Sequence, residues 1–83
     1  MDKESASETH LVLCLNNEGY PASLEVGKIY RAIPDKEAAA HGYMRVVDES
    51  GDDYAYAAER FYRVALPEEV EQALLSAFDE LAA

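Results

Sequence analysis

Tyrosine is the residue type in this chain with the widest capacity for binding chemistry. The sequence holds six tyrosines and two phenylalanines. A tyrosine ring combines apolar contact area with a hydroxyl group, which makes it common at protein interfaces. Tyr20 with Tyr54 or Tyr56, beside Glu18 and Asp53, would form an acidic, tyrosine-lined groove suited to a basic or proline-containing peptide. Alternatively, the rings cap the two open ends of a small barrel, and the sequence leaves both interpretations open.

Four acidic residues surround Gly51, and they are Asp48, Glu49, Asp52 and Asp53. A calcium loop needs several oxygen ligands at fixed spacing, with a bidentate glutamate downstream. That spacing is absent here, so the acids predict a polar hairpin tip. Asp48 is suited to closing the turn by accepting hydrogen bonds from backbone N–H groups.

The residues that usually carry catalysis or bind metal are sparse and scattered. His10 and His41 fall in different segments without a nearby cysteine or an H-x-x-x-H pattern, whereas a zinc site needs three or four ligands. Three serines, at positions 23, 50 and 76, lack the local context of a nucleophile. The glycines form no phosphate loop. We therefore expect no catalytic residues, no metal and no cofactor, and we do not expect an enzyme.

The charge balance narrows the choice of partner. Seven basic and 17 acidic residues give a net charge of −10. This charge repels phosphate backbones, and the basic residues are scattered rather than gathered in a stripe, so we do not expect nucleic-acid binding. A protein or peptide is the expected partner, and a basic one fits best. The simpler interpretation is that the charge only keeps a small protein in solution.

The sequence predicts a single domain without a membrane-spanning segment. Its 83 residues suffice for a single small core. Residues 1–9 are polar, small or charged and predict a disordered tail rather than a secretory signal. No apolar run approaches the roughly 18 residues of a spanning helix. The single cysteine, Cys14, excludes an intramolecular disulfide, and its apolar neighbours predict a packed thiol. We expect a cytoplasmic protein that does not bind membranes.

Five segments have the apolar content and turn boundaries of short strands. They are residues 10–15, 28–33, 43–48, 53–57 and 61–66. The first is apolar throughout and predicts a strand buried on both faces. The clearest local pattern is a hairpin of the third and fourth segments around Gly51. A long loop over 16–27, a short helix over 35–41 ending at Gly42, and a turn of 3₁₀ type over 58–60 complete the predicted barrel, residues 10–66.

An amphipathic helix is predicted for residues 67–81, within a C-terminal segment over 67–83. Pro67 suits the first helical position, and acidic residues follow it at the positive end of the helix dipole. Its apolar residues recur at spacings of three and four, and they are Val70, Leu74, Ala77, Phe78 and Leu81. This stripe must be buried, either against the barrel or against a second copy or another protein. A monomer or a weak homodimer follows from these two possibilities.

The order of these elements resembles an SH3 barrel. The likeness rests on A-S-L-E-V-G-K-I-Y-R-A-I, on Y-M-R-V-V-D-E-S-G-D-D-Y-A-Y and on A-A-E-R-F-Y-R-V, which correspond to the loop and second strand, the central hairpin, and the last turn and strand. The stretches C-L-N-N-E-G-Y-P-A-S-L-E-V-G-K-I-Y and R-V-V-D-E-S-G-D-D-Y-A-Y also resemble a group of short bacterial and phage proteins of uncharacterised function. The resemblance covers residues 10–66.

The resemblance implies a mainly β fold, a five-stranded SH3-like barrel with a C-terminal amphipathic helix. Many SH3 domains bind proline-rich peptides on an aromatic groove. This chain has no tryptophan and no tyrosine-rich first strand, so we do not expect that mode. The sequence thus favours a non-catalytic interaction module that binds through a tyrosine-lined acidic surface. The alternative is a structural or assembly protein that dimerises through its helix.

Overall fold

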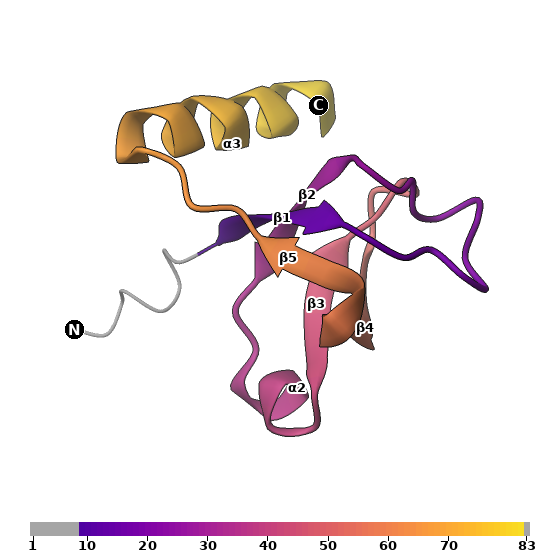
Figure 1. Ribbon diagram of the computed structural model, residues 1–83. Helices are drawn as coiled ribbons and strands as arrows, with labels where there is room; N and C mark the ends of the chain where they lie inside the picture. Colours follow the sequence, from indigo (N-terminus) through magenta and orange to yellow (C-terminus); the bar gives the residue numbers. More distant parts are fainter. Residues whose placement is uncertain (1–8, 83) are drawn as a thin grey trace.

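The fold is mainly β, as predicted, with five antiparallel strands curled into a half-barrel and a C-terminal helix (Figure 1). The structure is a computed structural model that describes the backbone of residues 9–82 and the side chains of residues 9–78. Apart from Thr9, the tail predicted for residues 1–9 lies outside the described residues.

The strands form one sheet in the order β4-β3-β2-β1-β5. Their bounds are β1 (His10–Cys14), β2 (Ile29–Ile33), β3 (Tyr43–Val47), β4 (Asp53–Ala57) and β5 (Phe61–Arg63). The first and last strands are neighbours, with Leu13 opposite Tyr62. A short helix, α2 (Lys36–Ala40), joins β2 to β3, and a 3₁₀ turn, η1 (Ala58–Arg60), joins β4 to β5.

The core lies on the inner face of the curled sheet. Its buried side chains are Val12, Cys14, Leu24, Tyr30, Ala32, Val46, Tyr56 and Phe61. Successive side chains of a strand point to opposite faces, so the buried pair Tyr30 and Ala32 settles which face of β2 is the inner one. Leu24 reaches this core from the long loop, where no strand forms.

Strand β1 is buried on both faces, which confirms the interpretation of its apolar sequence. Val12 and Cys14 belong to the core, while Leu11 is fully buried on the opposite face. Helix α3 (Glu68–Ala82) contacts β1 and lies across the top of the sheet in Figure 1. The helix therefore adds a second, smaller apolar layer outside the sheet.

The face that α3 turns to the protein differs from the predicted stripe. Leu74 and Phe78 are half-buried as expected, and Leu75 joins them. Val70 and Ala77 are exposed instead, and the side chain of Leu81 lies outside the described residues. The buried face is thus shifted to one side of the predicted stripe, because spacing alone shows where apolar residues gather but not which edge of the stripe meets the sheet.

The turns follow from local residue chemistry. Asp35 caps α2 by accepting a hydrogen bond from the Ala38 amide at 3.0 Å. Gly42 ends that helix with a φ of 79°, and Gly51 adopts a φ of 89° in the β3–β4 hairpin, a region that other residues rarely enter. Strand β5 ends at Arg63, three residues before the predicted end, and the amide of Val64 beyond it donates to the Leu11 carbonyl.

Candidate functional site

Three segments meet around a surface hollow of about 230 Å³, here called the tyrosine hollow. Tyr20 and Ser23 come from the loop between β1 and β2, and Ser50 comes from the β3–β4 hairpin tip. The remaining lining residues, Tyr54, Ala55 and Tyr56, are consecutive in β4. The hollow therefore combines aromatic walls with serine hydroxyls at its margin.

Tyr56 forms the floor of the hollow. Its side chain belongs to the core, and the residue is only 4% exposed. Three other rings lie around it in T-shaped arrangements, with centroid distances of 5.0 Å to Tyr20, 6.4 Å to Tyr54 and 6.0 Å to Phe61. Edge-to-face contacts of this kind are favourable and fix ring orientation. Tyr20 and Tyr54 remain 44% and 54% exposed, so their rings are available to a partner.

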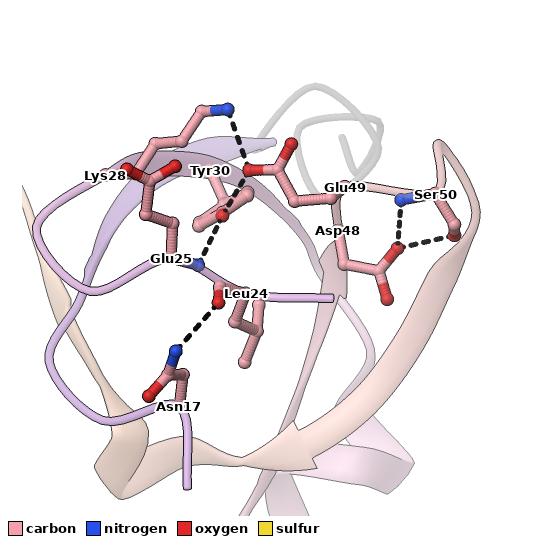
Figure 2. A network of polar contacts seen from close by, with 8 residues as sticks. All are labelled: Asn17, Leu24, Glu25, Lys28, Tyr30, Asp48, Glu49 and Ser50. Carbon is pink, nitrogen blue, oxygen red and sulfur yellow. Dashed lines mark hydrogen bonds and ion pairs between the residues drawn. The ribbon is translucent and has the colours of Figure 1, made fainter. Parts of the chain in front are cut away.

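A buried carboxylate holds the floor in place. Asp48 is 6% exposed and accepts a 2.5 Å hydrogen bond from the Tyr56 hydroxyl. Its other oxygen accepts hydrogen bonds from the amide and the hydroxyl of Ser50, at 2.9 and 2.6 Å (Figure 2). This confirms that Asp48 closes the turn, and it also ties the hairpin tip to the floor of the hollow.

These bonds change the ionisation of both groups. Burial opposes the charge on Asp48, but the hydrogen bonds from Ser50 and Tyr56 outweigh it, so the pKa of Asp48 lies below its usual value. Burial, assisted by the Asp48 carboxylate, raises the pKa of Tyr56 to about 12. At neutral pH the pair is therefore a carboxylate that accepts a bond from a neutral phenol.

A cation covers part of Tyr20. The guanidinium of Arg60 lies 4.9 Å from the centroid of that ring, a distance typical of a cation–π contact. Arg60 also donates to the backbone oxygen of Asn16 at 3.3 Å. Tyr20 is thus held between the ring of Tyr56 and the guanidinium of Arg60, which fixes one wall of the hollow.

A second polar network fastens the long loop to the hairpin tip (Figure 2). The hydroxyl of Tyr30 accepts a bond from the Glu25 amide at 2.8 Å and donates to the Glu49 carboxylate at 2.5 Å. Lys28 pairs with the same carboxylate at 2.7 Å. The pKa of Glu49 is lowered, mainly by the hydrogen bond from Lys28 and to a smaller extent by the one from Tyr30. The pKa of Tyr30 is raised, mainly by burial and also by its bond to Glu49.

The same region is held by backbone and amide bonds. The amide of Glu49 donates to the carbonyl of Ser23 at 2.9 Å, and the Asn17 side chain donates to the carbonyl of Leu24 at 3.0 Å. Ser23 and the hairpin tip are therefore directly joined. The walls of the hollow that come from the loop and from the hairpin are positioned before any partner binds.

The structure brings together the predicted tyrosines but not the predicted acids. Tyr20, Tyr54 and Tyr56 all line the tyrosine hollow, with Tyr56 as the buried floor. Glu18 is exposed in the long loop and does not line the hollow. Asp53 lies on the opposite face of β4 from the tyrosines, because side chains alternate along a strand, and it pairs with Arg45 at 3.2 Å.

Sequence reasoning missed several residues of this site. Ser23, Ser50 and Ala55 line the hollow, and Arg60 stacks on one wall. Ala55 could have been found, because it lies between the two tyrosines of a predicted strand. Ser23 and Arg60 carry no comparable signal, since only the folding of the loop and of η1 brings them to the tyrosines.

Among residues 9–78, no three histidine, cysteine, aspartate or glutamate side chains are arranged to hold a metal ion. Cys14 is a free thiol buried in the core, and burial raises its pKa. No helix over residues 9–82 is long and apolar enough to span a membrane.

Comparison with known proteins adds no family to this description. No family model, no curated protein and no solved structure matches the chain. Function must therefore be inferred from the tyrosine hollow and the surfaces around it.

Proposed function

We propose that the protein is a non-catalytic module that binds a protein or peptide at the tyrosine hollow. The observation that carries this proposal is the pair of half-exposed rings, Tyr20 and Tyr54, set over a floor that Asp48 and Tyr56 hold rigid. Exposed aromatic rings on a fixed support bury large area at small entropic cost when a partner binds. These features are typical of the energetic centre of an interface.

We propose further that the half-barrel is an SH3-like barrel. Strand order supports this, since the first strand lies between the second and the last. The long loop after β1, the tight β3–β4 hairpin and the 3₁₀ turn before β5 occur in the sequence order of that fold. Interaction modules are common among small barrels, but a shared fold does not specify a partner.

The proposed partner is basic. The net charge of −10 attracts cationic segments and repels nucleic acid and anionic lipid. Asp52 is exposed at the hairpin tip, two residues from Tyr54. The single buried thiol, which has no disulfide partner, supports the accompanying proposal of a cytoplasmic protein.

An NMR titration of the isotope-labelled protein with lysine-rich and proline-containing peptides tests this proposal. We expect shifts at Tyr20 and Tyr54, and loss of binding in Tyr54→Ala. Tyr62→Ala is the matched control, because Tyr62 is 65% exposed in β5 and does not line the hollow. Shifts that avoid Tyr20 and Tyr54, or equal effects of the two substitutions, would contradict the proposal.

A second candidate function is assembly through α3. Val70 and Ala77 are exposed on this helix, which leaves a small apolar strip uncovered in the single chain. Sedimentation of the full chain at micromolar concentration separates the two candidates, because a clean monomer of 9.2 kDa excludes assembly through the helix. A dimer that Val70→Glu dissociates would favour it.

A further inference from the structure

Strand β4 forms one edge of the sheet, and among the strands that the structure describes β3 alone pairs with it. Two backbone hydrogen bonds, one at each end of the β3–β4 pair, show which opposed residues are bonded to each other. The Asp48 amide donates to the Asp52 carbonyl, and the Ala58 amide donates to the Gly42 carbonyl. In an antiparallel pair, opposed residues alternate between bonded and non-bonded positions. The register therefore places the amide and carbonyl groups of Ala55 at the open edge of β4, away from β3.

The same alternation applies to the neighbours of Ala55. Asp53 also lies at a non-bonded position opposite β3, so the open edge presents the backbone groups of Asp53 and Ala55. Ala57 has the same position, but it is the N-cap of η1, and its carbonyl accepts the first bond of that turn. Such a row of backbone groups is a template for another strand.

This edge has few of the features that block strand addition. Proteins protect edges with lysine, proline, bulges or very short strands. Strand β4 has five residues without lysine or proline, and its single charge, on Asp53, is paired with Arg45. The other edge strand, β5, has only three residues and carries Arg63.

The tyrosine hollow adjoins this edge. Ala55 lines the hollow together with Tyr54 and Tyr56, whose side chains point to the inner face of the sheet. A strand added to β4 would project every second side chain to that inner face. One of these side chains would therefore lie at the hollow, beside Tyr20 and Tyr54.

We propose that the partner binds as an extended basic segment that adds an antiparallel strand to β4 and places one basic side chain in the tyrosine hollow. The inference rests on the proposed function, because it specifies how the same hollow is occupied. Cationic side chains are attracted to the faces of tyrosine rings, and the net charge of −10 favours them further. The same charge disfavours a second copy of this chain at the edge, since two acidic molecules repel each other.

The geometry predicts which amides of the partner are used. In an antiparallel ladder, the residue opposite Ala55 exchanges both backbone bonds with it, and its side chain points away from the hollow. The residues whose side chains enter the hollow turn their amides away from β4. In a peptide of alternating valine and lysine with lysine in the hollow, the valine amides therefore pair with β4.

Three versions of one acetylated peptide, T-K-V-K-V-K-V-K-T, test the proposal by NMR on the intact chain. The first is unmodified, the second is N-methylated at its valines, and the third is N-methylated at its inner lysines. All three carry the same charge and side chains. We expect the first and third to shift Tyr20 and Tyr54 and to slow hydrogen exchange of the Ala55 amide, and we expect the second to lose both effects.

Each other outcome overturns a defined part of the proposal. If the valine-methylated peptide shifts Tyr20 and Tyr54 as strongly as the unmodified one, strand addition is wrong while binding at the hollow stands. If all three peptides leave these residues unshifted, both the inference and the proposed basic partner fail. If the Ala55 amide is protected without peptide and sedimentation shows a dimer, a second copy occupies the edge and the inference is overturned.

Discussion

Asp48 is the residue on which the tyrosine hollow most depends. Buried acids are rare because an unpaired charge in the interior is costly, yet both oxygens of this carboxylate are bonded. The acid therefore has a different structural task from the neighbouring Glu49, which accepts hydrogen bonds from Tyr30 and Lys28. Asp48 links the hairpin turn to the floor of the binding surface.

Replacing Asp48 with alanine should destabilise the protein by about 2 kcal/mol, because the buried hydroxyl of Tyr56 would lose its acceptor. Urea unfolding followed by tyrosine fluorescence measures this change. Asp52→Ala is the matched control, since Asp52 is an exposed acid of the same hairpin, and it should change stability by less than about 0.5 kcal/mol. Equal losses in the two variants would show that the buried bonds are unimportant.

Tyr56 should make stability depend on alkaline pH. Its pKa is raised to about 12 in the folded protein, against a usual value of about 10, so the fold favours the neutral phenol. The stability this provides is complete below the unfolded pKa and is lost as pH rises from about 10 towards about 12. Absorbance titration should show late ionisation of both Tyr30 and Tyr56, and Tyr56→Phe should remove one of these two contributions. An unchanged titration curve at high pH would contradict the assignment.

At the scale of elements, local chemistry made several parts of the fold predictable. Gly51 between two alternating segments indicated the β3–β4 hairpin, and Asp35 with Gly42 indicated the two ends of α2. The apolar run of β1 indicated burial on both faces. These features depend on residues close in sequence, so the sequence pattern contains them.

Features set by tertiary contacts could not be predicted in the same way. The placement of Ser23 and Arg60 at the tyrosines follows from the closure of the long loop on the hairpin and of η1 on Asn16. Asp53 is adjacent to Tyr54 in sequence, which suggested one groove, but strand alternation sends the two side chains to opposite faces. Sequence proximity was misleading there because the period of a strand is two.

The orientation of α3 leads to a prediction on two of its apolar residues. Leu74 is half-buried towards the sheet and Val70 is exposed on the same helix. Leu74→Ala should lower the free energy of unfolding by about 1–2 kcal/mol, because it removes packing over β1, while Val70→Ala should change it by less than about 0.5 kcal/mol. Chemical denaturation of both variants measures the difference. A larger effect at Val70 would favour the assembly interface instead.

At the scale of the whole molecule, charge is the dominant feature. The net charge of −10 is carried by a chain whose described ion pairs, such as Lys28 with Glu49, lie near the surface. Exposed pairs contribute little to stability, whereas self-repulsion among excess acids opposes the compact state. Repulsion between the excess acidic side chains therefore outweighs the contribution of the ion pairs to stability.

Salt should accordingly stabilise the protein. Raising NaCl from about 0.02 to about 0.2 M shortens the Debye length from roughly 20 Å to roughly 7 Å, which screens the repulsion more than it weakens close pairs. Thermal unfolding should shift to higher temperature over this range. A falling midpoint would mean that the surface ion pairs outweigh the repulsion.

The pairing of β1 with β5 also has a consequence during synthesis. Strand β1 leaves the ribosome early, yet its second neighbour is not made until the chain has grown past Arg63. At roughly 5–20 residues per second, the apolar segment around Leu11 to Cys14 waits for seconds with one edge unpaired. Contacts between such distant segments also form slowly. A nascent or truncated chain that stops before Phe61 therefore exposes its most apolar strand, and aggregation competes with folding until the last strand arrives.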